Sequence, residues 1–565
     1  MNSTFQYPRL TVALLAITTL SVHAQTPPDA GALLRETERQ QRQLPKPGPQ
    51  AIPAAPASAA QAGVRIHVKA FKLSGHSLIA EPELQAVLAP WVGKESSFAE
   101  LQIAVNALTE HYRRYGWFVR VQLPAQDIND GIITLNILEG RLGAVRIDDG
   151  GKALRIDRNF VSESMTERQK PGDPLNLDAL ERSSNILNDT PGVTVATVLA
   201  PGDKPGDTDA MVKVADKPPL TGSAQLDNQG ARSTGSDKLS LGGTLDNPSG
   251  RGDQIALNSN ASRGSTYVKL SYSLPVGRDG LRVGGNLSQM NYRLLGDFAK
   301  SGTRGDATTW GINAYYPLQR AATANTGLSL AYDNKDYNVK HNLDAAPGKK
   351  ANTVIASLTG DLLDGFGAGG MTLWGINLTA GNIDLDGNAK NAAADAKGPD
   401  TAGSFYKLGY SLARLQRLDG KTTLWATFNG QTAGKNLDAS EQMGLGGPAG
   451  VRAYPVMEST GDDGWLATLE LRYSLSPELQ LTGFYDHGQM RVRHDYGYDT
   501  TGALRSGTLK GWGIGVNYTL AGNYALRASW AHRLGDNPFA DANTGNDQDG
   551  SKDLNRFWLT AIKFF

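Results

Sequence analysis

Cysteine is absent from the 565-residue chain, so neither a disulfide framework nor a thiolate metal site can form. The eight histidines are scattered, without the HExxH spacing or any other ligand spacing of a metal centre. Basic and acidic residues number 56 each, and such a balance does not favour binding to nucleic acid. We therefore expect no metal, no cofactor and no nucleic-acid partner.

Long hydrophobic runs are lacking as well. The apolar stretch Thr11 to Leu20 follows Arg9 and leads to Ser21-Val22-His23-Ala24, a small-x-Ala ending. This stretch is too short to cross about 30 Å of hydrocarbon as a helix, whereas the whole pattern is typical of an export signal. We expect residues 1–24 to be a signal peptide. No other stretch approaches the ~18–20 apolar residues of a spanning helix, so a membrane would have to be crossed by strands.

A polar segment and a linker come next. Asp29 to Leu44 is rich in Leu, Arg, Glu and Gln and has no Gly or Pro after Gly31, which predicts a short, highly charged helix. Residues 45–63 are rich in Pro and Ala without periodicity, which is typical of an extended linker. We assign residues 25–44 to an N-terminal helix that the linker tethers loosely to the rest.

Residues 64–218 alternate short strands with helical stretches, and the pattern occurs twice. The first unit, 64–142, is predicted to contain a strand at 64–73, helices at 81–88 and 98–115, and strands at 118–123 and 132–138. The second unit, 143–218, is predicted to contain a strand at 144–148, helices at 157–166 and 177–188, and strands at 193–199 and 210–215. Both units have the order β-α-α-β-β, as the change between the two periodicities indicates.

Beyond residue 219 the helical periodicity disappears. Segments of about ten residues alternate apolar with polar side chains between clusters of Gly, Asn, Asp and Ser. In Thr266 to Leu274, for example, Val268, Leu270 and Tyr272 share one face, and lysine and serine take the other. The pattern predicts antiparallel β-strands.

The size of the region 219–565 favours a membrane barrel over a soluble β-sandwich, the alternative for alternating strands. At roughly 20–24 residues for each strand and its connection, the region holds about fourteen to eighteen strands. A sandwich rarely runs that long, and it would expose the Tyr and Trp side chains of the apolar face to water, whereas lipid and its interfaces accommodate them. Low overall hydropathy is compatible with a barrel, because half of each strand faces a wet lumen.

Four motifs resemble those of one known family. Three are 138–141 (LEGR), 227–235 (DNQGARSTG) and 246–253 (DNPSGRGD), which are similar to the end of its first periplasmic domain, its first barrel strand and turn, and the hairpin connection that follows. The most specific is 446–455 (GGPAGVRAYP), close to the signature of its sixth loop. Over nearly the whole mature chain the sequence resembles the outer-membrane transporters of two-partner secretion, the haemolysin-activator and filamentous-haemagglutinin-transporter family.

The resemblance implies a fold. It is a transmembrane antiparallel β-barrel of about 16 strands (219–565), whose sixth extracellular loop, near 440–460, folds back into the lumen. Two periplasmic α+β POTRA (polypeptide-transport-associated) domains precede the barrel, at 64–142 and 143–218. The N-terminal helix is then a plug that rests in the lumen and leaves when substrate arrives; the alternative is a solvated helix with no gating role.

The resemblance also implies a site. The motif of loop six has four members here: Val451, Arg452, Ala453 and Tyr454. Alanine at 453 replaces the glycine usual in the family, which puts the conformation of the turn in question. The family pairs the loop arginine with an aspartate on the inner barrel wall, in a Phe-x-Asp-x-Gly pattern supplied here by Phe484, Asp486 and Gly488.

Strand alternation supports a lumenal position for Asp486. If Leu481 and Tyr485 face lipid, Asp486 faces the lumen, where an Arg–carboxylate pair can be bidentate and partly desolvated. The alternative is that Arg452 and Asp486 are unrelated lumen charges.

The function implied is secretion of an unfolded partner protein across the outer membrane, with the POTRA domains in the periplasm (type V, two-partner secretion). The partner is a large secreted exoprotein, adhesin-like or haemolysin-like, with an N-terminal secretion domain. Residues 118–123 and 193–199 are candidate edge strands for its capture by strand addition. The terminal aromatic residue Phe565 would serve as the signal for the barrel-assembly machinery, which the chain reaches through periplasmic chaperones before meeting outer-membrane lipid.

Other functional classes are less favoured. No Ser-His-Asp arrangement or singled-out carboxylate pair suggests catalysis, so we expect no enzyme. An outer-membrane insertase shares the POTRA-plus-barrel plan and is the main alternative, but two POTRA domains and an N-terminal helix argue against it. A passive porin would leave the periplasmic residues unexplained.

Overall fold

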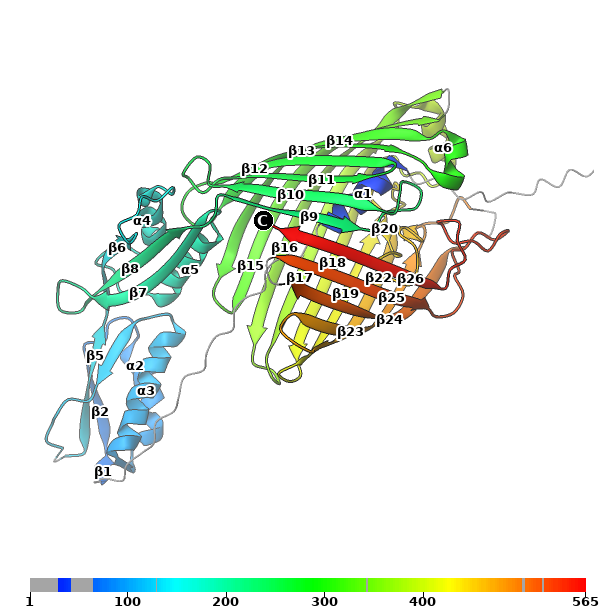
Figure 1. Cartoon of the computed structure of the whole chain (residues 1–565). Helices are drawn as coiled ribbons and strands as arrows, with labels where there is room; N and C mark the ends of the chain where they lie inside the picture. Colours follow the sequence, from blue (N-terminus) through cyan, green and yellow to red (C-terminus); the bar gives the residue numbers. More distant parts are fainter. Residues whose placement is uncertain (1–28, 42–64, 129, 342–343, 500–503, 521–522) are drawn as a thin grey trace, which may run out of the picture.

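The computed structural model describes residues 29–41, 65–128, 130–341, 344–499, 504–520 and 523–565. Two small α/β units lie in a row beyond one end of a large β-barrel (Figure 1). We call that end of the barrel the unit end and the opposite one the far end. The predicted signal peptide, 1–24, and the predicted linker, 45–63, lie outside the described residues.

The first unit follows the predicted order, with two more strands than predicted. Its elements are β1 (Arg65–Val68), β2 (Ala70–Ser74), α2 (Glu81–Leu88), η1 (Ala89–Trp91), β3 (Lys94–Ser97), α3 (Phe98–Arg114), β4 (Val119–Gln122) and β5 (Ile132–Glu139). The sheet has the order β2-β5-β4, and Leu84, Leu108 and Tyr112 are buried in the core between sheet and helices. The predicted single strand 64–73 is divided, because β1 pairs with β3 instead. The chain enters β3 through Gly93, whose φ of 78° few other residues adopt.

The second unit repeats the plan. Its elements are β6 (Arg141–Asp148), α4 (Arg158–Thr166), α5 (Leu177–Asp189), β7 (Val193–Pro201) and β8 (Asp207–Asp216), and the sheet order is β6-β8-β7. Asp209 on β8 ties the sheet together by accepting hydrogen bonds from the Arg146 side chain (2.6 Å) and the Ala144 N–H (2.7 Å). The bond from Arg146 holds the pKa of Asp209 below its usual range. Strands β4 and β7 lie at sheet edges, each paired with a single neighbour.

The described part of residues 219–565 forms a closed antiparallel barrel of sixteen strands. They are β9 (Leu220–Asp227), β10 (Lys238–Asp246), β11 (Gln254–Ser262), β12 (Ser265–Pro275), β13 (Arg282–Arg293), β14 (Arg304–Arg320), β15 (Ala324–His341), β16 (Asp344–Asp364), β17 (Gly370–Asp384), β18 (Gly403–Arg417), β19 (Thr422–Ala433), β22 (Asp463–Ser474), β23 (Leu479–Arg491), β24 (Ser506–Leu520), β25 (Tyr524–Arg533) and β26 (Asn555–Phe564). The far-end connections hold η2 (Gly296–Ser301), α6 (Ala389–Lys397) and the short pair β20 (Met443–Gly444) and β21 (Thr460–Gly461). Pairing of β26 with β9 closes the ring.

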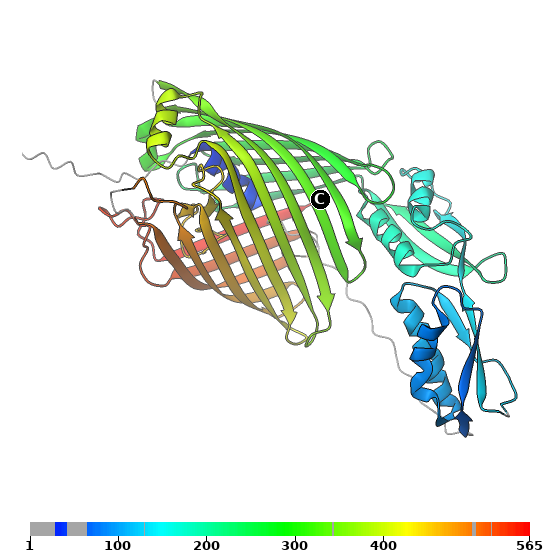
Figure 2. The ribbon, with the colours of Figure 1, turned by 180° about the vertical axis from the view of Figure 1, so that it is seen from behind.

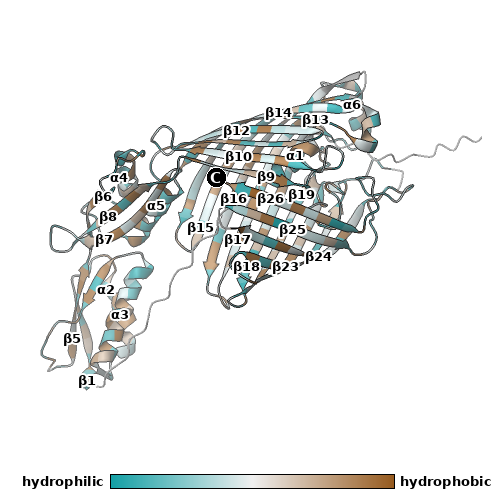
Figure 3. Ribbon diagram, in the orientation of Figure 1, coloured by the Kyte–Doolittle hydropathy of each residue, from teal (hydrophilic) through white to brown (hydrophobic). Residues whose placement is uncertain are grey.

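The two faces of the barrel wall differ as the alternation predicts. On β22, Leu469, Leu471 and Tyr473 are exposed on the outside, while Glu470 between them is nearly buried inside. Apolar residues are spread along the strands all over the wall (Figure 3). Among the described helices, none is long and apolar enough to cross a membrane.

The second unit is docked on the short turns of the unit end. Asp279, in the turn between β12 and β13, forms ion pairs with Arg168 (2.7 Å) and Arg182 (3.1 Å) of the second unit. Tyr316 of β14 also donates a hydrogen bond to Asp279. Arg320 of β14 pairs with Asp189 at the end of α5 (2.6 Å). Charged contacts therefore fix the second unit to the early strands of the barrel.

Inside the barrel lie a helix and a long loop. Helix α1 (Ala30–Gln41) is enclosed by the wall, as the two opposite views agree (Figures 1 and 2). The connection between β19 and β22, residues 434–462, is the sixth at the far end among the described strands, and we call it loop six. Both bear on the predicted site.

Candidate functional site

Helix α1 begins at a cap and buries an apolar face. The Asp29 carboxylate accepts hydrogen bonds from the Gly31 N–H (2.6 Å) and the Ala32 N–H (3.2 Å), which satisfies free donors of the first turn. Leu33 and Leu34 are buried against an apolar patch on the lumen wall. This patch comprises Tyr267, Met290, Tyr292, Ala307, Tyr337, Ala351, Ile383 and Phe405. The helix thus covers apolar side chains that would otherwise face the lumen.

Ion pairs join α1 to both the wall and loop six. The Lys349 ammonium of β16 lies between Asp29 (2.5 Å) and Asp438 of loop six (2.7 Å). At the other end of the helix, Arg39 donates to the Gly444 carbonyl of loop six (2.8 Å). The plug position of α1 and the folded-back position of loop six are therefore coupled.

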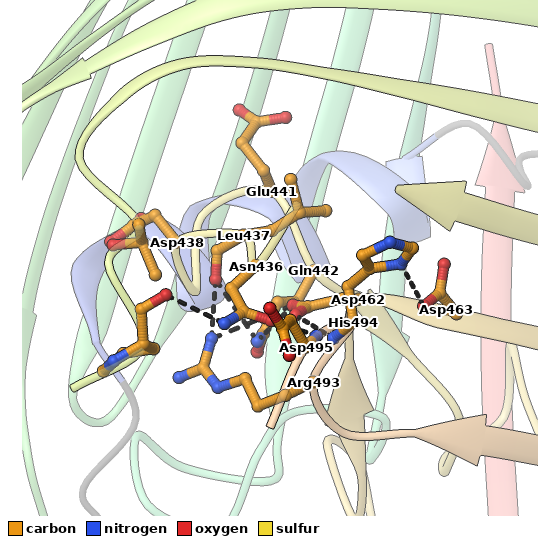
Figure 4. A network of polar contacts seen from close by, with 12 residues as sticks. Asn436, Leu437, Asp438, Glu441, Gln442, Asp462, Asp463, Arg493, His494 and Asp495 are labelled. Carbon is orange, nitrogen blue, oxygen red and sulfur yellow. Dashed lines mark hydrogen bonds and ion pairs between the residues drawn. The ribbon is translucent and has the colours of Figure 1, made fainter. Parts of the chain in front are cut away.

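The root of loop six is held by the next far-end loop (Figure 4). Asp462, which is fully buried, accepts from the Gln442 side chain (2.8 Å) and from the His494 N–H (2.9 Å). Arg493 donates to the Leu437 carbonyl (2.7 Å), and the Asp495 N–H bonds to the Asn436 side chain (2.7 Å). These bonds join both ends of loop six to the segment that follows β23.

The tip of loop six carries Arg452, and the structure places it against Asp486. Arg452 Nε and Nη2 donate to the two carboxylate oxygens at 2.8 and 2.7 Å, and its backbone N–H adds a third bond at 3.1 Å. Thr468 of β22 also donates to Asp486, whose side chain is fully buried. This bidentate geometry fixes the direction of the arginine as well as its charge.

Three further side chains surround the Arg452 guanidinium. It lies over the Phe484 ring, with Cζ 3.4 Å from the ring centroid. Its remaining Nη1 donates to Glu470 of β22 (2.7 Å), and Glu470 is shared with Arg472 (2.5 Å). The cluster around loop six therefore holds two cations and two carboxylates.

The other motif residues close the turn. Val451 donates through its N–H to the Leu445 carbonyl (2.8 Å), and Val451, Ala453 and Tyr454 are all fully buried. Ala453 has no left-handed φ, so the turn does not require the family's usual glycine. The Ala453 side chain instead faces Gly511 of β24. Arg533 of β25 lies over the ring of Tyr454, with its Cζ 4.5 Å from the ring centroid.

Two more wall residues contact loop six, and we call the wall residues around its tip the seat of loop six. Gly488 of β23 leaves room for Leu445, because a Cβ at position 488 would lie 2.4 Å from Leu445 Cδ1. Trp558 of β26 donates from its indole N–H to the Arg452 carbonyl (2.8 Å). The tip of loop six thus contacts β22, β23, β24, β25 and β26.

The sequence reasoning missed four members of this seat: Glu470, Gly511, Arg533 and Trp558. Glu470 alternates with Leu469 and Leu471 along β22, but only the register with β23 brings it opposite Phe484. Nothing in a single sequence aligns positions this far apart. Phe565 lies at the closing seam, where its N–H and carbonyl exchange hydrogen bonds with Gly222.

No cluster of potential metal ligands occurs within the part of the chain that the structure describes. Ion pairs, hydrogen bonds and packing hold loop six and α1 inside the barrel.

Comparisons with known proteins bear on this architecture. The family described as haemolysin secretion/activation protein ShlB/FhaC/HecB matches residues 206–518, and the ShlB-type POTRA domain matches residues 66–140. The heme/hemopexin transporter protein HuxB of Haemophilus influenzae is 27% identical over 98% of both chains. The solved structure of CdiB from Escherichia coli superposes with a TM-score of 0.71 at 20% identity, over 96% of this chain and all of that one. BamA from Haemophilus ducreyi superposes with a TM-score of 0.50 at 15% identity, over 88% of this chain and all of that one, a likeness of fold alone.

Proposed function

The chain belongs to the haemolysin secretion/activation protein family, the outer-membrane transporters of two-partner secretion, and from this premise we propose how its parts move a partner across the membrane. The barrel lies in the outer membrane, with the unit end toward the periplasm and the far end outside. The first unit is a POTRA domain. We propose that residues 143–218 form a second one, since the same order of elements recurs there.

The two units would capture the partner. Strands β4 and β7 have free edges, to which an extended segment can add with main-chain hydrogen bonds and little demand on its sequence. The partner would be a large secreted exoprotein, adhesin-like or haemolysin-like, with an N-terminal secretion domain. The name of the relative HuxB makes a heme- or hemopexin-binding exoprotein one class to test first.

Helix α1 would act as the plug of the resting pore. Its position in the lumen is the observation that carries this proposal, together with its ties to loop six through Lys349 and Arg39. Substrate that reaches the pore would displace the helix, and the partner's folding outside would draw the chain through. No catalytic site is needed for these steps, and we propose that the protein is not an enzyme.

Export and assembly of the transporter complete the proposal. Residues 1–24 would direct the chain to the periplasm, chaperones would carry it unfolded, and the barrel-assembly machinery would recognise the end at Phe565. Lys563 lies two residues earlier on the same face, with its ammonium 3.8 Å from the centre of the Tyr524 ring, so it can reach the interface without burying its charge in lipid.

Deletion of the gene tests this function against the insertase alternative. We expect the secreted partner to disappear from the medium while other outer-membrane barrels keep their amounts. Depletion of other barrels with the partner still exported would replace the transporter by an insertase. Complementation with the intact gene is the control.

A further inference from the structure

A polar channel remains beside α1 and loop six. It is a cavity of about 440 Å³ that runs along the lumen face of β22 to β26 and of β9. Its walls carry amides and hydroxyls such as Gln225, Gln480, Asn517 and Ser529. Gln40 of α1 lines it too, so departure of the helix would widen it. The opposite half of the lumen holds the apolar patch under α1, so the polar half is the side that the late strands form.

Positive charges outnumber negative ones along this channel. Four charged residues line it: Arg452, Glu470, Arg472 and Arg527. Glu470 is already shared between two of the arginines, and Arg452 also holds Asp486. The side chain of Arg527, on β25 between Asn517 and Thr560 of the neighbouring strands, makes no ion pair or hydrogen bond with any residue that the structure describes. The channel therefore presents a free guanidinium to whatever occupies it.

We propose that this channel is the lane of the exported polypeptide and that Arg527 is its specificity-determining residue, favouring acidic and uncharged polar segments over basic ones. The inference rests on the proposed function and names the side-chain chemistry of the substrate. A fixed cation in a narrow polar pore selects for negative charge, as arginine and lysine do in anion pores. Repulsion of like charges acts against basic segments. Because Arg452 lines the lane while bound to Asp486, the polypeptide passes without release of loop six.

Export of charged partner variants tests the proposal. A short run of lysines or of glutamates is inserted into the secreted partner, and the amount of each in the medium is measured. We expect the wild type to favour the glutamate variant, Arg527→Lys to keep that ratio, and Arg527→Glu to change it about fivefold toward lysine, the effect of one charge contact in water. An unchanged ratio with Arg527→Glu would overturn the proposal.

Ion selectivity of the full-length protein in planar bilayers gives a reading that does not depend on the partner. The reversal potential in a potassium chloride gradient should shift toward cations for Arg527→Glu. It should stay unchanged for Arg414→Ala, which removes an arginine that pairs with Asp364 and does not line the channel. Equal shifts for both variants would contradict the proposal that Arg527 sets the charge selectivity of the channel. If the wild type exports the partner but neither the export ratio nor the reversal potential responds to Arg527→Glu, this proposal fails and the proposed function stands. If the wild type exports no partner at all, the proposed function fails and the polypeptide path fails with it, whatever the ion selectivity.

Discussion

Arg452 and Asp486 make the most directional contact of loop six, yet small residues decide whether the loop can reach it. A Cβ at position 511 would lie 2.5 Å from the Cβ of Ala453, and one at 488 would meet Leu445. Gly447, inside the loop, has a φ of 95°, a conformation that side chains rarely adopt. Glycines on the wall therefore define the depth at which the loop is seated.

Substitution of Gly511 should lift the tip of loop six. Gly511→Ala places a methyl group against Ala453, and overpacking of this kind costs about 1–3 kcal/mol. We expect loop six to become more sensitive to protease in the assembled barrel, and Ala453→Gly to restore resistance in the double variant. Gly483→Ala is the matched control, because a Cβ there meets nothing within 4 Å. Equal sensitivity of the two alanine variants would contradict this packing.

The sequence predicts some residues of the site and not others. The pairing of Arg452 with Asp486 followed from a motif resemblance and from strand alternation. The packing of Ala453 could not be predicted in the same way. Its neighbour Gly511 lies on β24, and no local sequence pattern gives the register of that strand. Glu470 shares this limit, since its contact with Arg452 depends on how β22 pairs with β23.

Among the elements, the turn between β12 and β13 decides how the second unit is held. Burial alone would raise the pKa of Asp279, but the hydrogen bonds from two arginines and a tyrosine outweigh it and hold the pKa well below the usual range. The ionised carboxylate therefore strengthens docking. That contribution is complete above the ordinary aspartate pKa of about 3.9 and is lost as pH falls through the lower, docked-state pKa.

Asp279→Asn should loosen the second unit at neutral pH. The chain has no cysteine, so a pair of spin labels can be attached to introduced cysteines on α5 and on a unit-end turn. We expect the distance distribution to broaden in the variant, and to broaden in the wild type only at strongly acidic pH. Asp419→Asn is the control, because, among the described residues, Asp419 bonds only within its own turn. Unbroadened distances in Asp279→Asn would show that other contacts carry the docking.

Helix α1 offers a second test at the scale of elements. An ideal Cβ at Gly31 would lie 2.3 Å from the Cβ of Ser440 in loop six, so a slight shift of the helix gives the ~3.8 Å of a disulfide. Gly31→Cys with Ser440→Cys should block export when oxidised and regain it with reductant. Each single-cysteine variant is the control. Full export by the oxidised double variant would mean that α1 need not leave loop six.

The elements themselves were largely predictable, because periodicity is a local property. Helices α2, α3, α4 and α5 lie within a residue or two of the predicted ranges. The division of 64–73 into β1 and β2 was not predicted, since it depends on pairing with β3 across an intervening helix. The short pair β20 and β21 likewise forms only because loop six folds back.

At the scale of the whole molecule, the barrel is asymmetric. The early strands carry the docked second unit at one end and the apolar patch under α1 inside. The late strands hold the tip of loop six and line the polar channel. A substrate captured in the periplasm would thus meet a fixed entrance on one side and a polar path on the other.

The most direct test of this account compares export by the wild type with export by Arg452→Ala. Breaking a buried ion pair costs about 3–5 kcal/mol locally, because Asp486 is left uncompensated. Heat-modifiable gel mobility reports barrel assembly, and Arg414→Ala, which removes an arginine paired with Asp364 outside this site, serves as the control. We expect an assembled Arg452→Ala barrel that releases little partner into the medium. Full release by an assembled Arg452→Ala variant would contradict the claim that seated loop six is needed for transport.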